Sequence, residues 1–232
     1  MKKALLILAS VLVLAGCAKK EPAPAETAEP QTLGGWTVNT KIISNVMTEE
    51  QKAVFQKAAD AETEKQYQPV AMLASQIVSG TNYAFLALET DAEGSSGWTI
   101  VKVYRSLNDQ SEISSVSVID PSDLKTTDTG IKPGLDGGWE VNPARADAIV
   151  LDQEVSSAFA EACGEYEEAV LSPLVLIASK VVSGTKYLIL AQGTDWSDSS
   201  EHIYACDVWL KADNTAEAVN ISKLDLLAYL SE

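Results

Sequence analysis

The chain has one histidine, and acidic residues precede it closely in the sequence. His202 follows Asp195, Asp198 and Glu201 in the segment GTDWSDSSEH. An imidazole and carboxylates can hold a cation, but these acids do not follow the spacing of an EF-hand calcium loop. Serine and aspartate also favour solvated turns between strands. We therefore expect a turn here, with no metal site and no cofactor.

Motifs that carry catalysis are absent from the sequence. It contains no G-x-S-x-G nucleophile motif, no phosphate-binding loop and no zinc-ligand spacing. A single histidine also leaves few candidates for a general base. We therefore expect that the protein is not an enzyme and has no catalytic residues.

Two cysteines in the second half of the chain are expected to lie in one core. Cys163 is four residues after Phe159 and so lies on the same helix face. Cys206 shares a strand face with Val208. The pair could form a disulfide in an oxidising compartment or remain as two buried thiols.

The first residues are typical of a secretory signal. Lys2 and Lys3 precede an apolar run that is too short to cross a bilayer and ends in small residues. The run closes on Leu14-Ala15-Gly16-Cys17, which resembles the lipobox of bacterial lipoproteins. The resemblance implies that residues 1–16 are removed and that Cys17 carries a lipid anchor. An ordinary secretory signal with an incidental Cys17 is the alternative.

The segment after Cys17 is predicted to be a disordered tether, and the chain as a whole is strongly acidic. Residues 17–33 contain three prolines and little to bury, which predicts a disordered segment. Without Lys2 and Lys3 the chain has 15 basic residues against 33 acidic ones, a formal charge of −18. We therefore expect no nucleic-acid partner; the charge either keeps the surface soluble or steers a basic partner. We expect the protein in the cell envelope, outside the cytoplasm and anchored to a membrane.

The rest of the chain is an internal repeat. GGWTVN (residues 34–39) recurs as GGWEVN (residues 137–142), and QIVSGTNY (residues 76–83) recurs 104 residues later as KVVSGTKY (residues 180–187). A period of this length indicates tandem domains rather than a solenoid. We expect two domains, residues 34–130 and residues 131–232.

Each repeat predicts the same order of elements, one short strand, one helix and two β-hairpins. In the first repeat, residues 48–51 form a capping box before a helix with Val54 and Phe55 on one face. In the second, a helix is expected over about residues 152–166. This order predicts an α+β fold, in which each domain is an antiparallel sheet of four to five strands with one helix packed across it.

Several residues of the first repeat resemble the cystatins, protein inhibitors of papain-like cysteine proteases. A glycine pair (residues 34–35) precedes the first strand, and a Q-x-V-x-G motif is formed by Gln76, Val78 and Gly80. The run VYRSLND (residues 103–109) is similar to the stefin run V-F-Q-S-L-P-H. The likeness of element order extends over nearly all of residues 34–232.

The resemblance implies a wedge that enters the V-shaped cleft of such a protease. It would consist of the segment before the first strand and two hairpin tips at one end of the sheet. Apolar tip residues would supply contact, and the turn glycine would allow the backbone to approach closely. The implied residues are Gly34, Gly35, Gln76, Ile77, Val78, Ser79, Gly80, Leu107 and Asn108. We expect residues 77–79 to be exposed.

The second repeat departs further from the family pattern. Lys180 replaces the motif glutamine and Ala212 replaces the loop leucine, whereas the first repeat differs mainly in Asn108, where stefins carry proline. Val208-Trp209 is similar to the V-W of plant cystatins. The corresponding partner-binding residues, expected to bind more weakly, are Gly138, Lys180, Val181, Val182, Ser183, Gly184 and Trp209.

Two functions fit these features. One is a lipid-anchored inhibitor of papain-type proteases, whose partner is such a protease or another extracellular protein. The other is a non-inhibitory binding or spacer module, because V-x-G-T is a good turn sequence and duplication copies a turn whether or not it binds.

Overall fold

The computed structural model describes residues 34–39, 47–121, 124, 138–141 and 151–230. The predicted signal peptide, Cys17, the tether and the boundary between the two repeats lie outside these residues. Among the described residues, no helix is both long and apolar enough to cross a membrane.

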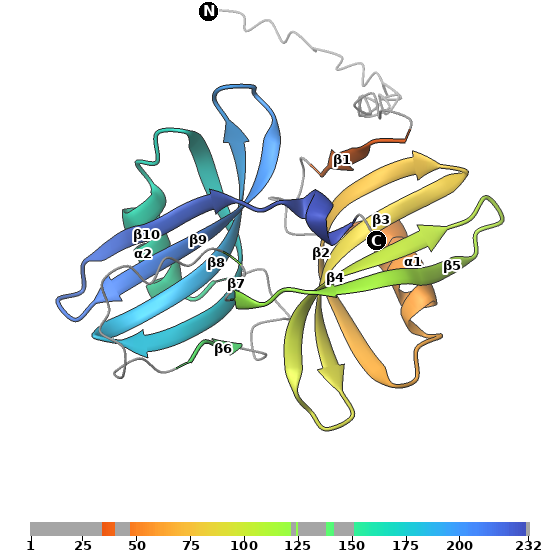
Figure 1. Ribbon diagram of the computed structural model, residues 1–232, viewed down its shortest axis with the longest axis horizontal. Coiled ribbons are helices and arrows are strands. Elements are labelled where there is room, and N and C mark those ends of the chain that lie inside the picture. Colours follow the sequence, from red (N-terminus) through yellow and green to blue (C-terminus); the bar gives the residue numbers. More distant parts are fainter. Residues whose placement is uncertain (1–33, 40–46, 122–123, 125–137, 142–150, 231–232) are drawn as a thin grey trace, which may run out of the picture. The chain divides into compact units, whose positions relative to one another are not determined.

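The first repeat forms one five-stranded sheet in the order β1-β2-β3-β4-β5, and every neighbouring pair is antiparallel (Figure 1). A helix, α1, lies between β1 and β2 in the sequence. The elements are β1 (Trp36–Val38), α1 (Glu49–Ala59), β2 (Lys65–Val78), β3 (Gly80–Asp91), β4 (Ser96–Arg105) and β5 (Ser111–Val118).

The second repeat has the same connectivity, with strand order β10-β9-β8-β7-β6. A short 3-10 helix, η4, follows its last strand. The elements are β6 (Glu140–Val141), α2 (Gln153–Cys163), β7 (Ala169–Val182), β8 (Gly184–Asp195), β9 (Glu201–Lys211), β10 (Ala216–Lys223) and η4 (Leu226–Tyr229).

Local signals fix where the helices begin. Thr48 caps α1, and the predicted capping box is confirmed, because the Thr48 hydroxyl accepts from the Gln51 N–H while the Gln51 side chain accepts from the Thr48 N–H. Asp152 caps α2 by accepting from the Val155 N–H (2.8 Å). The α2 helix is shorter than predicted, since it ends at Cys163.

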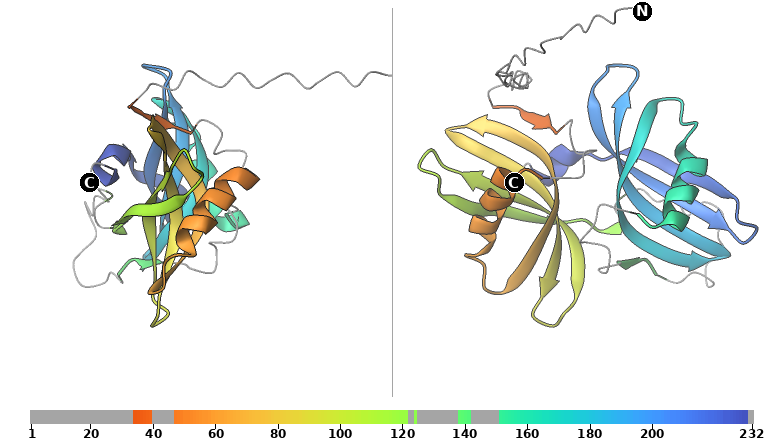
Figure 2. Two further views of the ribbon diagram at one scale, coloured as in Figure 1. Left: turned by 90° about the vertical axis from the view of Figure 1, so that its right-hand side faces the viewer. Right: turned by 180° about the vertical axis from the view of Figure 1, so that it is seen from behind.

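Each helix contacts one face of its own sheet (Figure 2). Phe55 of α1 is fully buried and meets Phe85 of β3 edge to face, with ring centroids 5.0 Å apart. Phe159 of α2 lies in the corresponding cluster with Ile189 and Tyr204.

The largest hydrophobic cluster lies on the opposite sheet faces and contains residues of both repeats. Leu73 and Leu86 of the first sheet belong to it, as do Ile177 and Leu188 of the second, all with no exposed surface. The segment around η4 joins this cluster, and the Ser117 hydroxyl of β5 donates to the Tyr229 carbonyl oxygen (3.0 Å). Each sheet therefore has two buried faces.

The predicted α+β class, with one helix packed across each of two tandem sheets as the basis of each domain, is wrong, although each helix does contact its own sheet. The described residues are mostly sheet, with two five-stranded antiparallel sheets and three short helices. The helices have 11, 11 and 4 residues, whereas the longest strands have 14. The physical reason is the shared cluster: the central strands bury both faces, and the main core lies between strands instead of under a helix.

We predict that shortening Leu188 to alanine lowers the stability of both repeats together. Removing a fully buried leucine costs about 2–5 kcal/mol. Because Leu188 lies in the cluster shared by both sheets, hydrogen exchange should also accelerate in β3 and β4. Leu107→Ala is the matched control, since Leu107 is 82% exposed and should change stability by less than about 0.5 kcal/mol. Faster exchange confined to β7–β10 would contradict the prediction.

Candidate functional site

Three segments meet at one end of the first sheet. The Gly34 N–H donates to the Ile77 carbonyl oxygen (3.0 Å), so the chain before β1 lies beside the turn between β2 and β3. On the other side, β3 and β4 stay paired as far as Arg105, where β4 ends. The first hairpin turn (residues 77–80) therefore lies between Gly34 and the second hairpin loop (residues 106–110). These are the three segments from which the sequence predicts a wedge.

Gln76 holds the segment before β1 against this hairpin. Its Nε2 donates to the Gly34 carbonyl oxygen (3.1 Å), and its Oε1 accepts from Asn82 Nδ2 (2.7 Å). In the sheet, Gln76 pairs with Trp36 of β1. The side chain thus links β1, β2 and β3, and both ends of its amide are used within the chain.

Gly80 brings the two hairpins into close contact. Its φ is +123°, a conformation that L side chains rarely adopt. A Cβ at this position would lie 2.4 Å from the Arg105 carbonyl oxygen, which is backbone and has little freedom to move. Beside it, the Tyr104 hydroxyl donates to the Ser79 carbonyl oxygen. The motif glycine is therefore required by the fold itself.

The tips of both hairpins are apolar and exposed. Val78 is 40% exposed and Leu107 is 82% exposed, while Ser79 and Asn108 are exposed polar neighbours. Ile77 and Gly35 are half-buried, so the expected exposure of residues 77–79 holds for two of three residues. A groove of about 470 Å³ lies between the two tips. Exposed valine and leucine at turn tips suit a contact surface better than they suit solubility.

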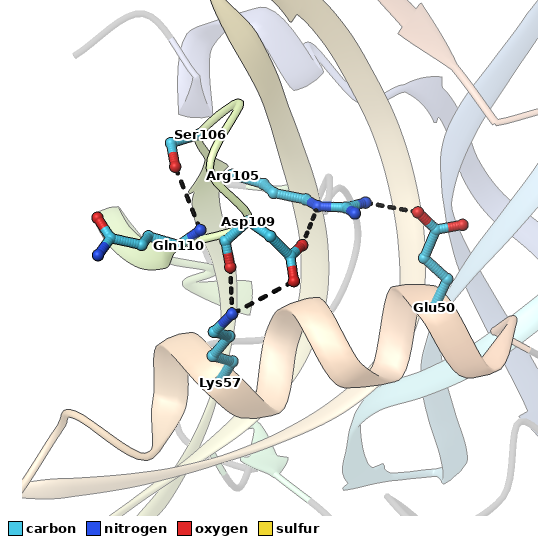
Figure 3. A network of polar contacts seen from close by, with 6 residues as sticks. All are labelled: Glu50, Lys57, Arg105, Ser106, Asp109 and Gln110. Carbon is cyan, nitrogen blue, oxygen red and sulfur yellow. Dashed lines mark hydrogen bonds and ion pairs between the residues drawn. The ribbon is translucent and has the colours of Figure 1, made fainter.

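Ion pairs connect the second hairpin loop to α1 (Figure 3). Arg105 bonds to Glu50 of α1 and, through Nε, to the Asp109 carboxylate (2.8 Å). Lys57 of α1 donates to the same carboxylate (3.4 Å) and to the Asp109 carbonyl oxygen. The Arg105 guanidinium and then Lys57 lower the pKa of Asp109, and Glu50 raises the pKa of Arg105. The loop that carries Leu107 is thus tied to the helix on one side.

The second repeat builds its hairpin in the same way. Gly184 has a φ of +106°, and a Cβ there would lie 2.2 Å from the Leu210 carbonyl oxygen. Trp209 takes the place of Tyr104, because its Nε1–H donates to the Ser183 carbonyl oxygen (3.0 Å). Trp209, predicted as a partner contact, therefore secures the turn with its polar atom.

The tip of the second repeat presents different side chains. Lys180, which replaces the motif glutamine, is 7% exposed, whereas Val181 is 72% exposed. Val182 is half-buried, although Val78 at the corresponding position is exposed. Gly138 is exposed. The two tips are alike in backbone and unlike in surface.

Cys163 and Cys206 lie in one core cluster beneath α2. Both are buried free thiols in the structure. Of the two possibilities that the sequence left open, a disulfide and two thiols, the structure contains two thiols. A hydrogen bond with Cys163, together with burial, raises the pKa of Cys206 well above its usual value.

Sequence reasoning missed the residues that fix the tips in place. Tyr104 and the ion-paired residues Lys57, Arg105 and Asp109 were not among the predicted site residues. Tyr104 carried a usable signal, because an aromatic residue, Trp209, stands 105 positions later in the second repeat. The ion pairs between α1 and the loop carried none, since Glu50 and Arg105, like Lys57 and Asp109, are more than 50 residues apart in the sequence.

The chain matches no protein-family model and no curated protein. A function must therefore be inferred from the geometry of the chain itself.

We predict that Gly80→Ala destabilises the first repeat more than Gly94→Ala does. Both glycines have positive φ, so each substitution introduces backbone strain of about 1–3 kcal/mol. A Cβ at residue 94 meets nothing within 4 Å, whereas at residue 80 it overlaps backbone, which adds about 1–3 kcal/mol. Urea unfolding of the two variants measures the difference. Equal losses would show that the close approach of the hairpins does not matter.

The loop ion pairs predict a pH dependence below about pH 4. Because the folded-state pKa of Asp109 is lowered, its pairing stabilises the loop above the ordinary pKa of 3.8 and is lost as pH falls through the lower folded value. NMR titration of the Asp109 carboxyl should give a midpoint below 3.8, and Arg105→Gln should raise it. Asp213 is the control, since its pKa is lowered by Thr215 and should not respond. A midpoint at Asp109 that is unchanged by Arg105→Gln would contradict this assignment.

Proposed function

We propose that this protein is a cystatin-like inhibitor of papain-type cysteine proteases and uses the first repeat as its binding wedge. The observation that carries the proposal is the pair of exposed apolar tips, Val78 and Leu107, at the end of the sheet where Gly34 is hydrogen-bonded to the first hairpin. The groove between the tips gives this end of the sheet two ridges, and each would contact one wall of the protease cleft.

Rigidity makes such a wedge effective. Tyr104 holds the first tip, and Arg105 with Asp109 and Lys57 holds the second, so little conformational entropy is lost on docking. Papain-like proteases attack a peptide carbonyl with a thiolate paired to an imidazolium. A wedge of turn tips fills the cleft around that thiolate without offering it a strand to cleave.

The second repeat is not proposed to inhibit. Lys180 is buried where the motif has glutamine, and Val182 is half-buried where the first repeat exposes Val78. Its strands instead contribute to the hydrophobic cluster that they share with the first sheet. We assign it the role of supporting the wedge.

A lipid on Cys17 would hold the inhibitor at a membrane of the cell envelope. The tether expected at residues 17–33 would then set how far the wedge reaches from the lipid. Proteases that approach the envelope from outside are the partners that such an anchor favours.

We predict that Val78→Asp weakens papain binding selectively. The substrate assay would use the mature chain with Cys17→Ser, and the inhibition constant should rise by the equivalent of about 2–4 kcal/mol, the range of an interface hot spot. The fold should lose little, because Val78 is 40% exposed at a turn.

Val181→Asp is the matched control, since it places the same charge on the exposed tip of the second repeat. It should leave inhibition unchanged. The wedge would be refuted if the unsubstituted chain fails to inhibit papain at micromolar concentration. It would also be refuted if Val78→Asp and Val181→Asp lose the same amount of inhibition.

A further inference from the structure

At the other end of the second sheet, three metal-ligating side chains converge near the β8–β9 turn. Asp195 ends β8, Asp198 lies in the turn and His202 lies in β9. Each side chain has one potential ligand atom that lies within 4.8 Å of the ligand atoms of the other two. Asp195 is 4% exposed, while Asp198 is exposed and His202 is half-buried.

The turn leaves one oxygen of Asp198 facing the imidazole. Asp198 Oδ1 accepts from the Ser200 N–H (2.9 Å) and hydroxyl, and its Oδ2 lies 3.7 Å from His202 Nε2. The Ser200 Oγ also hydrogen-bonds to His202 Nε2 (2.7 Å), so a cation bound through this nitrogen would replace that bond. Asp195 is arranged alike: Oδ1 accepts from Ser197, and Oδ2 is paired with the Lys223 ammonium. A positive charge is therefore already held at Asp195.

A second and independent feature marks the same place. Tyr204 has no exposed surface, and its hydroxyl has no hydrogen-bond partner among the described residues. It lies two residues after His202 on the same strand face, with the two rings in edge contact, and pairs across the sheet with Lys223. Lys223, whose ammonium pairs with Asp195, is thus the neighbour of Tyr204 in the sheet as well.

We propose that Asp195, Asp198 and His202 bind a divalent cation of the zinc class. One imidazole and two carboxylates are a ligand set that zinc accepts in tetrahedral sites with one open position, whereas calcium takes six to eight oxygens. The cation displaces the Lys223 ammonium, whose side chain is 42% exposed and has solvent to enter. A water on the open position supplies the partner that the Tyr204 hydroxyl lacks.

The first repeat provides an internal comparison. Asp91 occupies the position of Asp195 and caps its own turn by accepting from the Glu93 and Ser95 N–H groups. The residue that corresponds to His202 is Gly97. The proposed site is therefore confined to the second repeat and is separate from the wedge.

The single histidine allows a direct test. The mature chain with Cys17→Ser, purified without a histidine tag, is titrated with ZnCl₂ while the imidazole ¹H and ¹⁵N resonances are followed; these can come only from His202. We expect them to shift and to saturate at one equivalent. Asp198→Asn should weaken the affinity at least about tenfold. Lys223→Met should strengthen it, because it removes the competing ammonium.

Asp213→Asn is the control. Asp213 caps the β9–β10 turn through Thr215 in the way that Asp198 caps its own turn through Ser200, but it has no histidine beside it. Its loss should leave the zinc affinity unchanged. Three outcomes would overturn the site. The imidazole resonances do not respond to zinc, Asp198→Asn and Asp213→Asn weaken zinc binding equally, or Lys223→Met weakens zinc binding. None of these outcomes bears on inhibition.

Discussion

The contact between the two sheets through one hydrophobic cluster is the constraint on which the other features depend. A helix of 11 residues covers only one face of a five-stranded sheet, and the opposite face still carries leucine and isoleucine. Exposed, such a face would favour aggregation. Leu73 and Leu86 of one repeat and Ile177 and Leu188 of the other are buried together. Duplication thus provides each sheet with a second apolar face against which its own apolar face is buried.

This shared core leaves the hairpin ends free for other uses. β2 and β3 remain paired from Lys65 and Asp91 to Val78 and Gly80, beyond the buried central segments. The strands therefore act as a stiff support for a tip that contributes little to the core. At that tip, Gly80 and Tyr104 fix the geometry, so Val78 can be exposed without loss of order. The core and the proposed recognition surface are located in different parts of the same strands.

The local structure could be read from the sequence, whereas the layer arrangement could not. The capping box at Thr48 and the Ser-Gly turns depend on neighbouring residues, and both occur as predicted. The fold class depends on which faces are buried. Tyr187 to Ala191 are five consecutive apolar residues, and all are buried, which indicates two covered faces. The class was predicted from the order of the elements, which does not tell which faces are buried, and it was wrong. The ion pairs that join the second hairpin loop to Glu50 and Lys57 of α1 depend on tertiary contact and left no pattern in the sequence.

The two repeats differ at both ends of their sheets, outside the shared core. At the hairpin tip, Gln76 and Val78 correspond to a buried Lys180 and a half-buried Val182, so the surface changes while the backbone is kept. At the other end of the sheet, Gly97 corresponds to His202, which lies beside Asp198. Each substitution lies outside the strand segments that bury both faces. Because the two repeats bury their apolar sheet faces against each other, neither repeat can be deleted without exposing the other. The residues at the ends of each sheet can still change independently. The proposed binding surface in one repeat and the proposed cation site in the other are compatible with a single fold for this reason.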